Sequence, residues 1–166
     1  MENVSIDQIL IRSLRPEDNV AIAHVIRTTL SEFGADKPGT VYFDPTTDNL
    51  FELFRKLGAY YNVAIVNDSI VGGGGIYPSD GLPDGTCELV KMYLLPHVRG
   101  IGLGKKIITT CLEKANAFGY QQVYLETMTE LKAALKAYEK FGFKYLNGPL
   151  GNTGHFGCEL WMLKKL

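Results

Sequence analysis

A short run of glycines and basic residues between positions 98 and 106 has the composition of an anion-binding turn. It reads VRGIGLGKK, follows a β-prone stretch over residues 88–95, and precedes a helical pattern over residues 102–118. Backbone N–H groups at a helix start have no partner inside the helix, and the helix dipole makes that end positive. Glycines at alternate positions let the backbone approach a phosphate closely. The run therefore predicts a phosphate site, with a glycine turn and solvated basic side chains as the alternative.

Two common phosphate motifs do not fit this run. A Walker loop needs GxxxxGK followed by Ser or Thr. Here Gly100 and Gly104 are one residue too close, and Ile107 follows the lysines. A dinucleotide fingerprint needs GxGxxG at the opening of a βαβ series, but Lys105 occupies the third glycine position and the preceding strand comes late in the chain. Both interpretations fail on spacing.

The elements around the turn predict a mixed sheet in one domain over residues 1–166. Hydrophobic periodicity and turn residues predict strands over residues 6–13, 61–66, 70–77, 88–95, 122–128, 143–146 and 157–163, and helices over 16–33, 50–57, 102–118 and 131–142. Thr47 and Asp48 are expected to cap the second helix. Three successive strands joined by turns give an antiparallel meander, and the strand–helix–strand unit over 88–128 gives a parallel pair. The fold class is α+β, in the order β-α-α-β-β-β-α-β-α-β-β.

Three further patterns make the sequence resemble the GNAT superfamily of acetyl-CoA-dependent N-acetyltransferases. The turn matches R/Q-x-x-G-x-G, the strand before it ends in an apolar stretch and Pro96, and a later helix carries A-x-x-x-Y-x-x-x-G-F. The residues that carry the two motifs are Arg99, Gly102 and Gly104, then Ala134, Tyr138, Gly142 and Phe143. The resemblance covers the whole chain and is most specific over 88–143. It implies a GNAT-like central sheet, mostly antiparallel, with flanking helices.

The resemblance also implies where acetyl-CoA would bind. Backbone groups of Met92, Tyr93 and Leu94 would hydrogen-bond the pantetheine arm in a gap between two splayed strands. The backbone N–H groups of the turn would bind the pyrophosphate; the cofactor-binding residues there are Arg99, Gly100, Ile101, Gly102, Leu103, Gly104 and Lys105. Leu131 occupies a position where the family often has Asn. A polar side-chain contact from this position to the cofactor arm is therefore not expected in this chain.

For the chemistry, the resemblance implies that Tyr138 protonates the departing thiolate, since a phenol keeps its proton at neutral pH. A tyrosine on an apolar helix stripe is otherwise a core residue. Glu88 is the candidate base for the acceptor amine, or else a strand-end partner of Lys91, and Glu126 is the competing carboxylate. His155 lies in a glycine-rich loop that often borders the acceptor pocket in the family, although a lone loop histidine is usually a surface residue.

The remaining pocket candidates and the bulk composition narrow the function. The segment over residues 33–48, with Tyr42, Phe43 and Asp44, is expected to wall the acceptor pocket, or else its aromatic residues pack locally. The 166 residues carry 46% hydrophobic and 21% charged residues with a net charge of −1, which disfavours nucleic acid and anionic membranes as partners. Three cysteines without CxxC disfavour disulfides and structural zinc, and no metal is expected. The absence of a signal-like apolar run favours a cytoplasmic location.

The predicted function is therefore an N-acetyltransferase. It would move an acetyl group from acetyl-CoA to a primary amine by direct attack, with a small-molecule acceptor favoured over a peptide or protein one. The alternative is a CoA-binding regulatory or sensor module that keeps the fold without turnover. The resemblance also admits a homodimer.

Overall fold

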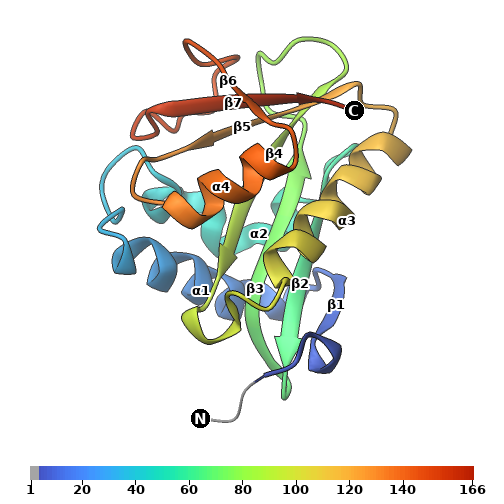
Figure 1. Cartoon of the computed structure of the whole chain (residues 1–166), viewed down its shortest axis with the longest axis vertical. Helices are drawn as coiled ribbons and strands as arrows, with labels where there is room; N and C mark the ends of the chain where they lie inside the picture. The colour runs from blue at the N-terminus through green and yellow to red at the C-terminus, as the bar shows by residue number, and fades with distance from the viewer. Residues whose placement is uncertain (1–3) are drawn as a thin grey trace.

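The computed structural model describes residues 4–166 and contains one seven-stranded sheet with helices on both faces (Figure 1). The strands are β1 (Leu10–Ser13), β2 (Tyr60–Val66), β3 (Ser69–Tyr77), β4 (Thr86–Leu94), β5 (Gln122–Thr127), β6 (Lys144–Tyr145) and β7 (Leu160–Lys165). The helices are α1 (Asn19–Glu32), α2 (Leu50–Leu53), α3 (Leu103–Ala117) and α4 (Lys132–Lys140), with short 3-10 turns between them. The predicted element order and fold class are confirmed.

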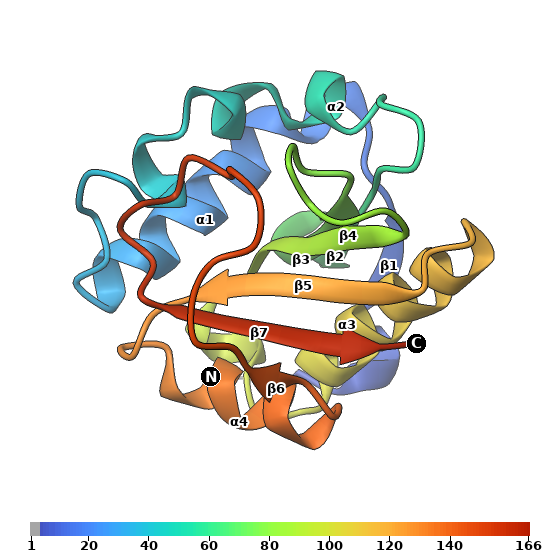
Figure 2. The same cartoon turned by 90° about the horizontal axis from the view of Figure 1, so that it is seen from above.

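The sheet divides the hydrophobic core into two parts. Its spatial order is β1-β2-β3-β4-β5-β7-β6, and every neighbouring pair is antiparallel except β4 and β5. Figure 2 shows α1 and α2 on one side of the sheet and α3 and α4 on the other. Ile22, Ile26 and Leu30 of α1 pack in one cluster, whereas Ile107 and Cys111 of α3 pack in the other. Both apolar faces of the meander are thereby covered.

Several element boundaries differ from the sequence prediction; the strand expected over 157–163, for example, is Leu160–Lys165. The expected strand over 6–13 begins only at Leu10, because Ser5 and Gln8 form a capping box around a 3-10 turn at Ile6–Gln8. The expected helix over 50–57 is a single turn, Leu50–Leu53. Its predicted cap at Thr47 and Asp48 was also wrong.

The actual cap in this region belongs to Asp44. Its Oδ1 accepts hydrogen bonds from Thr46 N at 2.9 Å and Thr46 Oγ1 at 2.6 Å, which starts a 3-10 turn at Pro45–Asn49 ahead of α2. The Thr47 hydroxyl instead donates to Val41 O at 2.9 Å. This leaves Asp44 Oδ2 available for contacts with residues of the sheet.

A gap opens where β4 and β5 diverge. Their parallel pairing covers only three residue pairs, from Thr86–Gln122 to Glu88–Tyr124. Beyond Glu88, the register of β4 against β3 shifts between Gly73 and Gly75, and Lys91 adopts φ +51°, a left-handed conformation that few non-glycine residues take. The bulge bends β4 away from β5, which matches the splayed strands that the resemblance implied.

Two of the four glycines of β3, Gly73 and Gly75, support this bulge. A Cβ atom at Gly73 or Gly75 would lie within 2.7 Å of the Tyr61 ring, so only glycine leaves room for that ring to lie across β3. The Tyr61 hydroxyl then donates to Lys91 O at 2.8 Å, and the side chain is 2% exposed. The glycine run therefore lets a tyrosine of β2 hold the backbone of β4 in its bulged conformation.

Candidate active site

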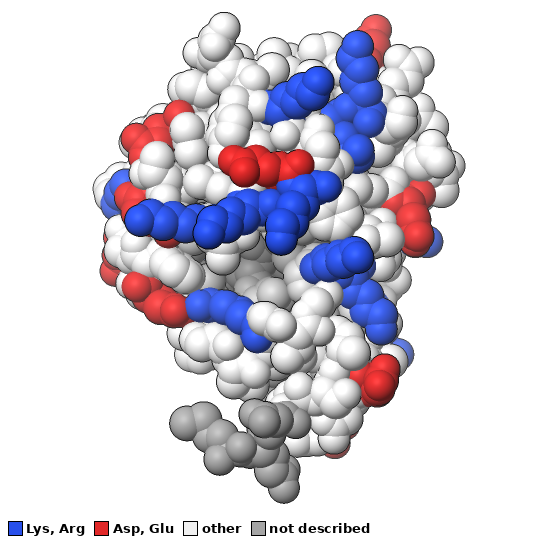
Figure 3. Space-filling model, in the orientation of Figure 1, with Lys and Arg blue, Asp and Glu red and all other residues white. Residues whose placement is uncertain are grey.

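A groove of about 750 Å³ runs between the start of α3 and the face of α4, and it reaches the far end of β4. Figure 3 shows it as a hollow bordered by Lys and Arg side chains. The predicted cofactor-binding residues that line it are Met92, Tyr93, Leu94, Arg99, Gly100, Gly102, Gly104 and Lys105. Ile101 and Leu103 do not line it. Ile101 packs against the core and Leu103 is 1% exposed, so either residue can offer only its backbone.

The turn at the start of α3 has the conformation that its glycines predict. Gly100 and Gly102 take φ +78° and +89°, in the left-handed region where a side chain is strained. Gly102 is the residue before α3, and no side chain caps the helix. The first N–H groups of α3 therefore stay without partners inside the helix at the edge of the groove.

Arg99 is already paired within the protein, unlike the other basic residues that line the groove. Its guanidinium forms a two-pronged ion pair with Glu32 of α1, at 2.7 and 2.8 Å, and donates to Leu94 O at 2.9 and 2.7 Å. Arg99 thus ties the turn to α1 and to the end of β4. Lys105, Lys136 and Lys140 also line the groove, and no carboxylate of residues 4–166 lies within ion-pair distance of them. These three lysines form the free positive rim of the groove.

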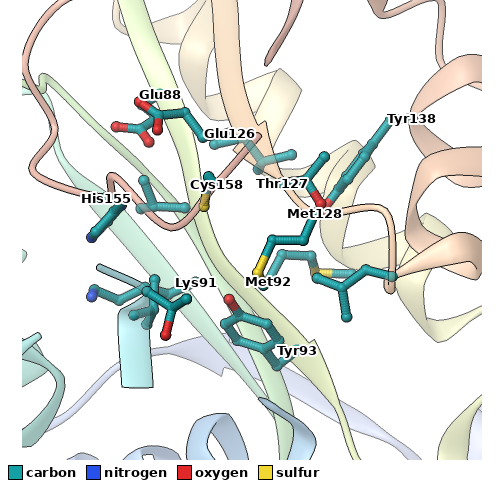
Figure 4. Close-up of a pocket in the computed structure, with 15 residues that line it drawn as sticks. Glu88, Lys91, Met92, Tyr93, Glu126, Thr127, Met128, Tyr138, His155 and Cys158 are labelled. Carbon is teal, nitrogen blue, oxygen red and sulfur yellow. The ribbon is translucent and has the colours of Figure 1, made fainter. Parts of the chain in front are cut away.

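A second, smaller cavity of about 40 Å³ lies in the gap between β4 and β5 (Figure 4). Met92, Tyr93, Leu131 and Tyr138 line both this cavity and the groove. Tyr138 is 7% exposed, and burial raises the pKa of its phenol. No group of residues 4–166 hydrogen-bonds to the Tyr138 hydroxyl, so this proton donor is uncommitted where the two spaces meet.

Glu88 lines the cavity and is 3% exposed. Its Oε2 accepts a hydrogen bond from Ser79 Oγ at 2.5 Å. Burial raises the pKa of Glu88 to about 7, and the Glu126 carboxylate adds to this rise, while the bond from Ser79 opposes it. A carboxyl group with a pKa near neutrality can exchange a proton with water at physiological pH, as a general base must.

A buried ionic cluster forms the wall beside β4. Asp44 and His155 were expected near the pocket, but their pairing with Lys91 was not predicted. Lys91 Nζ lies 3.1 Å from Asp44 Oδ2, and His155 Nε2 lies 3.2 Å from the same oxygen. Burial lowers the pKa of Lys91 in spite of Asp44. Burial also disfavours ionised Asp44, but the hydrogen bond from His155 and the Lys91 charge outweigh it and hold the pKa of Asp44 well below its usual range. A lysine in the middle of an apolar strand was the one signal for this cluster.

The structure brings His155 and Glu126 to the cavity but not Tyr42 and Phe43. The Tyr42 ring packs against Phe43 at 5.0 Å between centroids and against the guanidinium of Arg27, and Phe43 is 59% exposed. The 3-10 turn at Val41–Phe43 directs these aromatic residues away, so the preceding Thr40 and Val41 line the cavity instead. Local packing, the alternative for Tyr42, is what the structure contains.

Cys158 is the one cysteine at the cavity, and burial raises the pKa of its thiol to about 12. A thiol this weakly acidic is a poor nucleophile at neutral pH. Within the part of the chain that the structure describes, no cluster of three or more His, Cys, Asp or Glu is arranged to hold a metal ion. None of the helices in residues 4–166 has the length and apolarity needed to cross a bilayer.

Comparisons with known proteins agree with this geometry. Residues 24–143 match the acetyltransferase (GNAT) family. The chain is 43% identical to the uncharacterized N-acetyltransferase YjgM of Escherichia coli strain K12 over 168 aligned positions, covering 100% of both chains. A GNAT-family acetyltransferase of Staphylococcus aureus Mu50 superposes with a TM-score of 0.82 at 20% identity, covering 95% and 98% of the two chains. The paiA N-acetyltransferase of Thermoplasma acidophilum, solved in complex with coenzyme A, superposes with a TM-score of 0.74 at 20% identity, covering 95% and 99%.

The chain belongs to the acetyltransferase (GNAT) family, and it is an N-acetyltransferase. The family match includes the glycine-rich turn before α3, both diverging strands and the helix that carries Tyr138.

Proposed function

We propose that the protein transfers the acetyl group of acetyl-CoA to a primary amine by direct attack, with acetyl-CoA in the groove and the amine in the cavity. The observation that carries this proposal is the junction of the two spaces at Tyr138. Direct transfer, unlike transfer through a covalent enzyme intermediate, needs both reactants to meet in one place, and here that place has a proton donor. The high pKa of Cys158 supports a direct route.

The groove fits acetyl-CoA in size and charge. Its volume of about 750 Å³ lies in the range of ligand sites for molecules of this kind. Its floor includes apolar residues of α4 such as Ala134 and Ala137, which suit a pantetheine arm. The start of α3 and the rim formed by Lys105, Lys136 and Lys140 offer N–H groups and positive charge to the phosphates. The CoA complex of the Thermoplasma relative supports this assignment.

The chemistry assigns one proton transfer to each of two side chains. The neutral amine attacks the acetyl carbon, a C–N bond forms, and the C–S bond breaks. Tyr138 gives its proton to the departing sulfur, which avoids release of a buried thiolate. Glu88 receives the proton lost by the nitrogen, directly or through water, since its pKa of about 7 suits a base at neutral pH. The proton then returns to Tyr138 through solvent, which leaves the enzyme unchanged.

We further propose a reducing, cytoplasmic location, supported by the three free thiols of Cys87, Cys111 and Cys158.

The test is CoA release from acetyl-CoA in the presence of a panel of primary amines. Wild-type protein should release CoA only when an amine is present. Tyr138→Phe should lower kcat, whereas Tyr145→Phe should not, because the Tyr145 hydroxyl bonds to Glu139 and neither residue lines the groove or the cavity. Folded protein that releases no CoA with any amine would overturn the proposal.

A further inference from the structure

Each carboxylate at the far end of the cavity has one oxygen without a partner. Ser79 bonds to Glu88 Oε2, whereas Tyr124 and Thr153 both donate to Glu126 Oε1, at 3.2 and 2.6 Å. No group of residues 4–166 donates to Glu88 Oε1 or Glu126 Oε2. Among these residues, the one side-chain oxygen or nitrogen that is both fully buried and unpartnered is Asn62 Oδ1. Glu88 Oε1 and Glu126 Oε2 are unpartnered but not fully buried, so they remain accessible from the cavity.

The charges around the cavity leave the end that holds Glu88 and Glu126 negative. Lys91 is the one lysine or arginine that lines the cavity, and it is already paired with Asp44 at 3.1 Å. His155 also bonds to Asp44 and so turns its Nε2 away from the two glutamates. Figure 4 shows Glu88 and Glu126 toward one end of the cavity and Tyr138 toward the other. No cation of residues 4–166 therefore lies within ion-pair distance of either glutamate, and His155 and Lys91 favour ionised Glu88 only from a longer distance.

We propose that the acceptor is a short amine that carries a second positive charge and no carboxylate, and that Glu126 Oε2 binds the second ammonium group. The inference rests on the function proposed above. It places the reacting amine between Glu88 and Tyr138 and the second ammonium at Glu126, so that Glu88 stays available as the base. Tyr124 and Thr153 hold the Glu126 carboxylate in position from the opposite side. Glu126 is thus a specificity residue and not the base.

The size of the cavity limits the acceptor. About 40 Å³ accommodates roughly three water molecules. This favours a slender unbranched chain whose reacting amine lies at the junction with the groove, outside the narrowest part of the cavity. An α-carboxylate on such a molecule would lose its hydration beside Glu88 and Glu126, which penalises amino acids. The Lys91 ammonium does not offset this penalty, because its side chain is 3% exposed and Asp44 and Thr47 already accept from it.

The experiment compares three acceptors with the same carbon chain. Pentylamine has one cation, cadaverine has two, and lysine has two cations and a carboxylate. A hydrogen bond between charged groups predicts a kcat/KM for cadaverine that is about 10- to 100-fold above that for pentylamine. Lysine should be the poorest of the three. Equal values for cadaverine and pentylamine, or a preference for lysine, would overturn the inference while leaving acetyl transfer itself intact.

Variants then assign the effect to one carboxylate. Glu126→Gln should bring the cadaverine-to-pentylamine ratio toward one, mainly through the KM for cadaverine. Glu130→Gln is the matched control, because Glu130 bonds to Lys37 and Thr129 outside the cavity, and it should keep the wild-type ratio. An unchanged ratio in folded Glu126→Gln would overturn the assignment. If that variant does not fold, the wild-type ranking of the three acceptors decides. If the protein releases CoA with none of these three acceptors and with no other amine, the proposed function itself would be wrong.

Discussion

Replacing Glu88 with glutamine should lower activity and raise stability together at alkaline pH. Glutamine keeps the size of the side chain and can still bond to Ser79, but it cannot accept a proton. Glu88 is buried, and its pKa rises from 4.5 to about 7 on folding. A carboxyl group whose pKa is raised in the folded state stabilises the protein below pH 4.5, and this contribution is lost as pH rises through 7. Wild-type protein therefore carries a destabilising charge at pH 8 that the variant lacks.

The pKa change sets the size of both effects. A rise in the pKa of a carboxyl group from 4.5 to about 7 lowers the free energy of unfolding by about 3 kcal/mol at pH 8. For activity, a base with a pKa of about 7 is roughly one tenth ionised at pH 6 and nine tenths ionised at pH 8. The wild-type to variant ratio of kcat/KM should thus rise about tenfold across this range, reaching ~10² or more at pH 8.

The assay measures CoA release and urea unfolding at pH 5, 6, 7 and 8 for wild type, Glu88→Gln and the control Glu113→Gln, whose side chain is exposed on α3. Dividing wild-type rates by variant rates removes the ionisation of the acceptor amine, which is common to both. A ratio that stays flat between pH 6 and 8 would refute the role of Glu88 as the base. A variant that loses stability at pH 8 would refute the raised pKa.

Three further changes test other parts of the site. Tyr138→Phe should lower kcat by about 10²-fold and leave the KM for acetyl-CoA within about twofold, because the phenol acts in proton transfer; a drop in affinity alone would contradict this role. Gly102→Glu should abolish the rise in melting temperature that acetyl-CoA causes, since it adds strain and negative charge at φ +89°, whereas Gly148→Glu, in an open loop position, should retain the rise. Lys91→Met should lower the unfolding free energy by about 3 kcal/mol in urea titrations, because Asp44 loses its buried partner; an unchanged midpoint would contradict the pairing.

The parts of the fold that the sequence predicted depend on local patterns. The helix at α3 has a regular apolar face, and Gly102 and Gly119 mark its two ends with positive φ. The glycine-rich turn before α3 and the helix of Tyr138 are similarly contained in short motifs. These features do not require knowledge of which distant segments meet, so periodicity and spacing suffice to find them.

The cluster of Lys91, Asp44 and His155 depends instead on tertiary contacts. Asp44 and His155 are 111 positions apart, and only the docking of the loop after β6 against the segment before α2 brings them together. The bulge at Lys91 is equally non-local, because it requires the Tyr61 ring to fit over glycines of the neighbouring strand. Neither residue type nor spacing in one segment carries that information.

The boundary errors have a similar cause. Side chains of Ser5 and Asp44 bond to nearby backbone groups and start 3-10 turns in segments whose apolar residues favoured a strand or a longer helix. A separate 3-10 turn at Val41–Phe43, just before Asp44, explains why Tyr42 and Phe43 miss the cavity. Short turns of this kind thus determine which residues of the loop reach the site.

The central claim is that the groove and the cavity meet at Tyr138, and a crystal structure with bound CoA tests it most directly. The pantetheine arm should lie along the end of β4, with its sulfur within about 3.5 Å of the Tyr138 hydroxyl, a hydrogen-bond distance for sulfur. The phosphates should lie at the start of α3, near Gly102 and Gly104. A CoA molecule whose sulfur lies outside the gap between β4 and β5, away from Tyr138, would contradict the account.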